Sequence, residues 1–434
     1  MAENDVMHYK DWRSGTLTNG IERSAHRALL YSTGLEEKDL HKPMIAIVNS
    51  FTEMVPGHFH LRELAQCVAQ GVWEAGGVPR EFSTIAICDG ICQGHKGMSY
   101  PLPSRELIAD SIEYMIEAHQ FDAMVLMPGC DKIVPGMLMG AMRCNIPAIV
   151  VPGGPMMPGN SKEFPMLTLT DMRELIGRTQ TGKMSVEDLM AAEQTALPGV
   201  GTCSMLGTAN TMSCLAEVLG MSIPGCGLAH AVSAKKRRIA KQSGYRVVEM
   251  LKEDLTPRKI MTKEALRNGI IVSMAMGAST NSTLHIPAIA HEAGIDISLK
   301  DFDELSRKVP YLCNIKPSGA HPLLDLENSG GIPAVMKAVE PLLDGDAMTC
   351  TGKTVKENLK DVPLVENDVL FSLEHPKRPE GGLAILSGSL APDGAVVKQA
   401  GVKPSMQHFE GHARVFTSME DACHAVSGGE IKQG

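Results

Sequence analysis

Short, continuous apolar runs alternate with segments of helical periodicity over residues 44–155. The apolar runs lie at residues 44–49, 82–87, 121–127 and 146–151. Helical spacing occurs at residues 61–77 and 135–144. A further helix is predicted to begin at Ser104, which would cap its N-terminus. Buried strands that alternate with helices predict βαβ units and a parallel sheet covered by helices on both faces. The predicted fold class is therefore α/β.

The pattern changes character towards the C-terminus. Residues 160–195 are polar and contain a capped helix at Ser185, and residues 235–340 are mostly helical. Beyond them, GGLAILSGSL, GAVVKQAG and HARVF are short β-type runs bounded by Gly and Pro-Asp. We expect three parts: an α/β domain at 1–350, a linker at 351–380, and the beginning of a β-rich, barrel-like domain at 381–434.

Composition and charge narrow the class of protein. Of 434 residues, 44% are apolar and 21% charged, as in soluble globular proteins. The net charge is −9, and the one basic run, Lys235–Arg238, is interpreted as a solvated helix end, so we expect no nucleic acid as a partner. No apolar run approaches the ~20 residues that cross a bilayer, and residues 1–12 show no signal pattern. We expect a cytoplasmic protein whose eleven cysteines are free thiols or metal ligands.

Four loops follow the predicted strands, and ligands bind at this edge of open α/β sheets. Two of the loops carry a Cys-Asp pair, which is a moderately specific signal. The loops are Asn49–His58, Cys88–Gly90, Cys130–Lys132 and Pro152–Pro155.

The tripeptide Cys130-Asp131-Lys132 combines a soft and a hard ligand. Thiolates suit iron–sulfur clusters and carboxylates suit Mg²⁺, so neighbouring residues of one loop could face two different metals. A purely structural role is the alternative, in which Cys130 is a small buried residue and Asp89 and Asp131 cap turns.

Other residues could join such a site. Cys203 follows a Gly-rich turn just before a predicted helix, whose N–H groups would stabilise a thiolate. Cys88 is a further candidate ligand, whereas Cys92 is a weaker one. His58 and His60 have no paired-ligand spacing and are interpreted as supporting or surface residues. The remaining cysteines are interpreted as structural: Cys67, Cys144, Cys214, Cys226, Cys313, Cys350 and Cys423.

The small-residue stretch MGASTNSTLH, with Ser279 and Asn281, suits close packing or ligand contact. Gly199, Gly201 and Gly207 match neither GxGxxG nor a phosphate-binding loop, so a nucleotide site has no support.

Long stretches of the chain resemble the dihydroxy-acid, phosphogluconate and sugar-acid dehydratase family. They occur in the family's order and cover nearly everything from Arg13 to the predicted linker. LPSRELIADS and PGMLM favour the dihydroxy-acid branch, while GTCSMLGTANT and CDKIVPG also resemble the phosphogluconate branch. The matching stretches are NSFTEMVPGHFHLRELA, CDGICQGHKGMSYPLPSRELIADSIEYM, PGCDKIVPGMLM, GTCSMLGTANTMSCLAEVLGMSIPG and GASTNSTLHIPAIAHEAGIDI.

The resemblance implies two inorganic cofactors. Cys130 and Cys203 would be thiolate ligands of an iron–sulfur cluster. Asp89 and Asp131 would bind Mg²⁺ together with Lys132 carbamylated by CO₂. In some members a cysteine stands where this chain has Gly57 and completes a 2Fe–2S site. A 4Fe–4S cluster is therefore expected here, with Cys88 as its third ligand, and 2Fe–2S is the alternative. Gly57, His58, Ser279 and Asn281 would support the site or contact substrate.

The implied reaction is that of a hydro-lyase. It converts 2,3-dihydroxyisovalerate and 2,3-dihydroxy-3-methylvalerate to 2-keto acids in branched-chain amino acid biosynthesis, and the family suggests a homodimer. Members carry their serine base and a Mg²⁺-binding glutamate in a C-terminal segment that would lie beyond Gly434. We therefore expect a truncated chain with a metal site and little turnover. The alternatives are a sugar-acid or 6-phosphogluconate dehydratase, or a non-catalytic iron–sulfur-binding fragment.

Overall fold

A four-stranded parallel sheet lies at the centre of the N-terminal half. Its order is β2-β1-β3-β4, so the first strand pairs with both β2 and β3. The residues of β1, β3 and β4 are all buried, whereas β2 at the edge exposes part of its surface. The predicted α/β class is thereby confirmed. The strands are β1 (Met44–Asn49), β2 (Val78–Ser83), β3 (Ala123–Met127) and β4 (Ala148–Val150).

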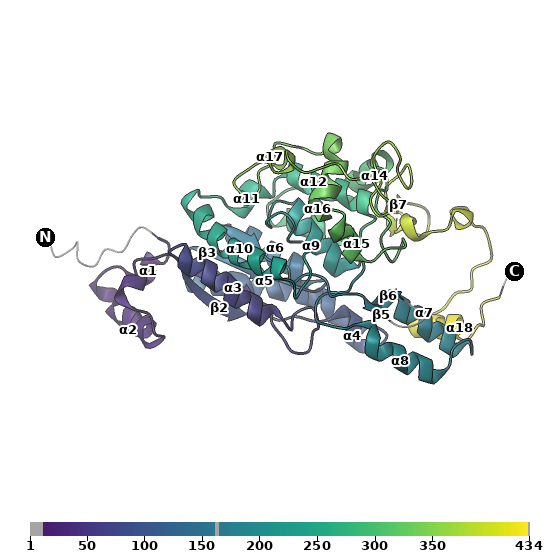
Figure 1. The fold of residues 1–434 in the computed structure, drawn as a ribbon, viewed down its shortest axis with the longest axis horizontal. Coiled ribbons are helices and arrows are strands. Elements are labelled where there is room, and N and C mark those ends of the chain that lie inside the picture. Colours follow the sequence, from purple (N-terminus) through teal and green to yellow (C-terminus); the bar gives the residue numbers. More distant parts are fainter. Residues whose placement is uncertain (1–11, 161–164, 433–434) are drawn as a thin grey trace.

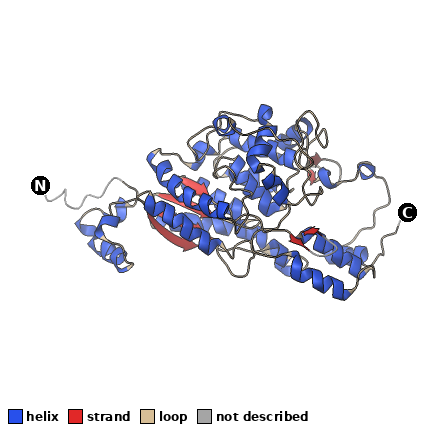
Figure 2. Cartoon of the chain, viewed as in Figure 1, coloured by secondary structure: helices blue, strands red, loops and turns tan. Residues whose placement is uncertain are grey.

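The computed structural model describes residues 12–160 and 165–432, in which helices predominate (Figures 1 and 2). The helices are α1 (Gly15–Thr18), α2 (Ser24–Ser32), α3 (Leu61–Glu74), α4 (Asp89–Cys92), α5 (Pro101–Ala118), α6 (Ile133–Cys144), α7 (Leu169–Gln180), α8 (Val186–Ala196), α9 (Thr208–Val218), α10 (Ala234–Lys252), α11 (Pro257–Ile260), α12 (Lys263–Met276), α13 (Ser282–His291), α14 (Leu299–Lys308), α15 (Leu323–Asn328), α16 (Gly331–Ala338), α17 (Val355–Leu359) and α18 (Met419–Ser427). Among these described helices, none is both long and apolar enough to cross a membrane.

Helices cover both faces of the sheet. On one face α3 packs against α10, where Gly71 and Gly244 let the two backbones approach closely. A Cβ on Gly71 would lie 2.0 Å from the carbonyl oxygen of Lys241, so a larger residue would force the helices apart. The crossovers through α5 and α6 run in the opposite direction along the sheet, and right-handed connections place them on the other face. These two helices pack against each other.

A second helical layer continues the same core beyond the sheet. Helix α9 contacts α6, α12 and α16, and α12 contacts α13 and α14. Their apolar side chains belong to one cluster with those of the sheet. Helices α7 and α8 form a small separate cluster with a short antiparallel pair and extend away from the main body (Figure 1). The remaining strands are β5 (Gly159–Asn160), β6 (Pro165–Leu167), β7 (Ala384–Leu386) and β8 (Ala395–Val397).

Three element predictions were wrong in detail. The second strand is Val78–Ser83 rather than 82–87, because an edge strand with one polar face shows no continuous apolar run. Helix α5 begins at Pro101, and Ser104 lies inside its first turn, donating to the Pro101 carbonyl instead of capping. Proline fits this turn because its missing N–H would be unpaired anyway. Residues 412–416 form no strand.

The basic run also differs from its prediction, because Lys236 is fully buried rather than solvated. Its ammonium donates to the carbonyls of Pro152, at 2.9 Å, and Cys226, at 2.6 Å. It therefore ties α10 to the loop after β4. Within residues 351–380, Val355, Leu359 and Leu370 belong to the main core.

Candidate active site

The loops that follow the strands of the main sheet meet the start of α9 at one cavity. Its volume is about 420 Å³. Asp89, Asp131 and Lys132 come from the loops after β2 and β3, and Cys203 comes from the turn before α9. Because parallel strands end at the same edge, residues distant in sequence converge there.

Lys132 lies between the two carboxylates of this cavity. Its Nζ is 2.6 Å from Oδ2 of Asp89 and 3.9 Å from Oδ2 of Asp131. The side chains of Lys132 and Asp89 are only 7% and 12% exposed, so the pair is screened from solvent. Oδ1 of Asp89 is buried without a hydrogen-bond partner among the described residues. The arrangement thus places a cation between two carboxylates and leaves one acceptor free.

The surroundings of Asp131 raise the pKa of its carboxyl group. Burial raises its pKa to about 6, and the neighbouring charge of Asp89 adds to the effect. Lys132 and a hydrogen bond from Thr208 act in the opposite direction. A positive charge at this position would favour the ionised carboxylate.

Three thiols approach one another beside these carboxylates. The neighbouring Cys130 thiol lowers the pKa of Cys88 to about 7. The interaction with Cys88 and burial raise the pKa of Cys130, and Cys203 is close enough to add to the rise. Burial raises the pKa of Cys203 to about 12. The structure therefore brings together the three cysteines predicted as ligands.

His58 supports the Cys130 loop from behind. It is fully buried, and its Nε2 accepts a hydrogen bond of 2.7 Å from the backbone N–H of Cys130. Its Nδ1 lies 2.8 Å from the carbonyl oxygen of Ser50, to which it donates. Burial lowers the pKa of His58 to about 4, so the ring is neutral at physiological pH. His58 is therefore a supporting residue, and neither it nor His60 lies at the surface.

Gly57 stands directly against the thiol of Cys130. A Cβ on Gly57 would be 2.8 Å from Sγ of Cys130 and 3.1 Å from Cγ2 of Thr202. Any side chain here would have to displace the thiol or the Thr202 methyl group. This position is consequently part of the wall around Cys130.

The turn that carries Cys203 is held by Asn210, a residue that the sequence motifs did not indicate. Nδ2 of Asn210 donates to the carbonyls of Cys203 and Met205, and Oδ1 accepts from Thr202 Oγ1 at 2.7 Å. Asn210 is fully buried in α9. Its position in the first turn of α9, directly after the Cys203 turn, was the signal that could have identified it.

Ser279 and Asn281 line the cavity from the segment before α13. Both contact Thr208: the two hydroxyls of Ser279 and Thr208 are 2.8 Å apart, and Nδ2 of Asn281 donates to Thr208 Oγ1 at 2.6 Å. Thr208 also reaches Asp131. The missed Thr208 therefore connects these two residues to the acidic pair.

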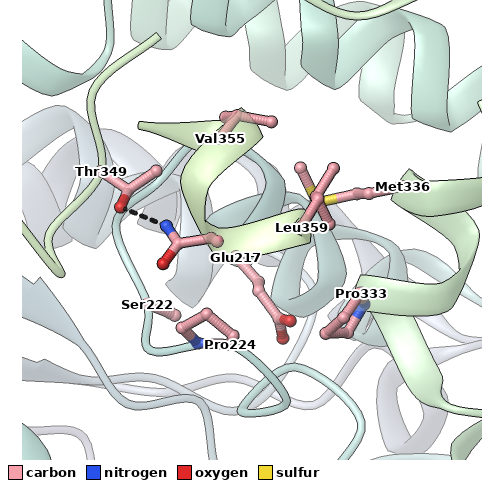
Figure 3. Close-up of a pocket in the computed structure, with 9 residues that line it drawn as sticks. Glu217, Ser222, Pro224, Pro333, Met336, Thr349, Val355 and Leu359 are labelled. Atoms are coloured by element: carbon pink, nitrogen blue, oxygen red, sulfur yellow. Dashed lines mark hydrogen bonds between the residues drawn. The ribbon is translucent and has the colours of Figure 1, made fainter. Parts of the chain in front are cut away.

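A second cavity lies away from this edge (Figure 3). It measures only about 30 Å³, room for roughly one water molecule. Glu217 borders it, and its carboxylate accepts hydrogen bonds from the backbone N–H groups of Gly225, at 2.6 Å, and Gly227, at 2.8 Å. The backbone donors thus give the Glu217 carboxylate a structural role. The cavity is too small for an organic substrate.

Comparison with known proteins assigns the family. The model of the dihydroxy-acid/6-phosphogluconate dehydratase N-terminal domain matches residues 42–358, and that of the C-terminal domain matches residues 368–434. The chain belongs to this family. It is accordingly a hydro-lyase, and the resemblance inferred from the sequence motifs is confirmed.

Curated relatives agree with the family assignment. A dihydroxy-acid dehydratase of Methanothermobacter thermautotrophicus is 52% identical over 423 residues, covering 97% of this chain and 77% of the relative. A dihydroxy-acid dehydratase of Methanosphaera stadtmanae is 51% identical with the same coverage. One of Halothermothrix orenii is 49% identical, again over 97% of this chain and 77% of the relative.

Proposed function

We propose that this hydro-lyase dehydrates 2,3-dihydroxyisovalerate and 2,3-dihydroxy-3-methylvalerate to 2-keto acids, using an iron–sulfur cluster and Mg²⁺. The observation that carries the proposal is the meeting of Asp89, Asp131 and Cys203 at one cavity of about 420 Å³, with the thiols of Cys88 and Cys130 close enough to Cys203 to interact with it. The relatives' name, dihydroxy-acid dehydratase, supports the substrate class.

The acidic pair fits Mg²⁺. Hard cations take oxygen ligands, and Asp89 offers a buried oxygen that has no other partner among the described residues. The ammonium of Lys132 now holds the position of a cation between the carboxylates, within 2.6 Å of Asp89. Carbamylation would replace that positive charge by an oxygen anion and free the space for the metal. Asp89, Asp131 and carbamylated Lys132 are the proposed Mg²⁺ ligands.

The thiols fit an iron–sulfur cluster. Cys88, Cys130 and Cys203 are mutually close, and three protein ligands would leave one iron of a 4Fe–4S cluster open. Gly57 supplies no fourth thiol, which favours 4Fe–4S over 2Fe–2S. The described residues contain no group of three His, Cys, Asp or Glu side chains already set as metal ligands.

The chain's own residues would position the substrate. When bound, the two metal groups would supply Lewis acidity that stabilises enolate-like charge and assists loss of hydroxide. Asn281 and Ser279, linked through Thr208, present donors and acceptors for the substrate's hydroxyl groups. Neutral His58 holds the backbone of Cys130, and Asn210 holds that of Cys203, so the two thiols keep fixed positions.

Binding and turnover by anaerobically reconstituted protein test this proposal. With iron, sulfide and Mg²⁺ supplied, 2,3-dihydroxyisovalerate should perturb the cluster's electron paramagnetic resonance spectrum after reduction and give the 2-keto acid at a low rate. 6-Phosphogluconate and a sugar acid serve as comparison substrates under identical conditions. Preference for either comparison substrate, or cluster formation without response to any of the three, would contradict the proposal.

Two further features stay predictions. One is the division into an α/β domain at 1–350, a linker at 351–380 and a further domain at 381–434. The N-terminal family model ends at residue 358 and the C-terminal one begins at residue 368, which supports a boundary within the proposed linker. The other is a homodimer, which sedimentation equilibrium of the reconstituted protein would test.

A further inference from the structure

Lys398 brings a second ammonium group to the active-site cavity. It directly follows β8 (Ala395–Val397), far along the chain from the other lining residues, and its half-buried side chain lines the cavity together with Asp131 and Cys203. Its Nζ donates one long hydrogen bond, 3.4 Å, to the carbonyl oxygen of Leu206. Leu206 lies on the turn after Cys203, so Lys398 reaches the part of the site that holds this thiol.

The backbone around Lys398 is firmly held, in contrast to its ammonium group. Arg378 donates to the carbonyl oxygens of Gln399, at 2.6 Å, and Val402, at 2.9 Å. The N–H of Ala400 donates to Gly382, which is itself bonded to α12. The structure thus presents the side chain from a fixed position while leaving its charged end weakly satisfied.

The other cations of the cavity already have partners. Lys132 is paired with Asp89, and Arg173 donates to Gln93 from an exposed position. Lys398 makes no salt bridge with a carboxylate of the described residues, and burial is the cause that lowers its pKa to about 8. Partial burial of an unpaired ammonium is unfavourable, and an anion bound beside it would relieve that cost.

We propose that Lys398 is a substrate-binding residue whose ammonium contacts a carboxylate oxygen of the dihydroxy acid. This inference rests on the proposed function, because the carboxylate is the ionised group that such a substrate carries at neutral pH. Lysine acts as a compact point charge that can follow the carboxylate without a fixed bidentate geometry. Lys398 would thereby help to select acids over neutral polyols.

Calorimetric titration of the reconstituted protein with 2,3-dihydroxyisovalerate tests the inference. Lys398→Met should weaken binding about 10- to 100-fold, the range expected for loss of one charge-assisted hydrogen bond. Lys398→Arg keeps the charge and should retain most of the affinity. The matched control is Lys403→Met, because Lys403 is exposed five residues further along the same segment. Cluster absorbance and circular dichroism should be unchanged in all three variants.

The outcomes separate the inference from the function on which it rests. Wild-type affinity in Lys398→Met, or a fall in kcat with KM unchanged, would overturn carboxylate binding by Lys398. If Lys398→Met fails to fold, Lys398→Gln replaces it, with the same weakening expected. Absence of any binding by the wild-type protein would refute the proposed substrate, and the inference with it. That result is recognisable because it appears before any variant is made.

Discussion

The imidazole Nε2 of His58 accepts a hydrogen bond of 2.7 Å from the backbone N–H of Cys130. These residues lie on loops after different strands, and their contact couples the conformation of the first loop to the position of the central thiol. The opposite ring nitrogen donates to Ser50, so the acceptor role of Nε2 is set by the neutral tautomer.

His58→Ala should lower the cluster content of the reconstituted protein and destabilise it. The substitution leaves a cavity and removes the acceptor of a buried N–H, together worth about 2–4 kcal/mol. Iron and sulfide analysis and urea unfolding measure the two effects. His26→Ala is the control, because His26 is exposed on α2. Full cluster content in His58→Ala would show that His58 does not position Cys130.

Replacement of either Cys130 or Cys203 by serine should abolish the visible absorbance of the cluster under anaerobic purification. Serine preserves the size of the side chain but not the soft thiolate that iron prefers. The exposed Cys423, changed to serine in parallel, should leave the spectrum intact. An undiminished spectrum in the Cys130 or Cys203 variant would remove that residue from the proposed ligand set.

Asp89→Asn should abolish Mg²⁺ binding while leaving the cluster spectrum intact. Without metal it should also destabilise the protein by about 3 kcal/mol, because the buried ammonium of Lys132 loses its partner. Isothermal titration with Mg²⁺ and absorbance spectra of the same sample provide the measurement. The exposed Asp296, changed to asparagine, is the control. Simultaneous loss of the cluster would instead assign Asp89 a structural role.

Glu217→Gln should change how stability depends on pH. Burial raises the pKa of Glu217 from 4.5 to about 7. Between these values the unfolded chain ionises first, so the folded state binds more protons and the free energy of unfolding falls as pH rises, by about 3 kcal/mol in full. Glutamine removes that contribution.

Urea unfolding at pH 5 and pH 8 measures the effect as a difference between wild type and Glu217→Gln. The difference is needed because His58, with its pKa lowered to about 4, gives the opposite slope: stability lost as pH falls below 6.5. Glutamine also leaves one backbone N–H, of Gly225 or Gly227, without its carboxylate acceptor, which lowers stability at both pH values. Equal pH dependence in both proteins would contradict a raised pKa for Glu217. Glu193→Gln is the matched control, because Glu193 is exposed.

The hydrophobic pattern predicted strands most accurately where helices cover both faces of the sheet. Runs such as 44–49 and 121–127 are continuously apolar because helices cover both faces of the sheet, and they became β1 and β3. The same rule failed at the edge, where β2 alternates, and at Lys236, whose buried ammonium is satisfied by carbonyls from distant segments. A basic run on a helix carries no local sign of such partners.

The sequence by itself determined the α/β class, the family and the loops on which Cys130, Asp131 and Cys203 lie, because strand ends and motifs are local properties of the chain. Only the tertiary structure decided which side chains meet: Lys132 with Asp89, 43 positions away, His58 with Cys130, and Lys398 with the Cys203 turn. Such contacts depend on strand order and on the approach of separate segments, which no periodicity encodes. Local motifs thus supply the thiols and carboxylates of the cavity, whereas the packing of distant segments decides which charged groups lie next to one another.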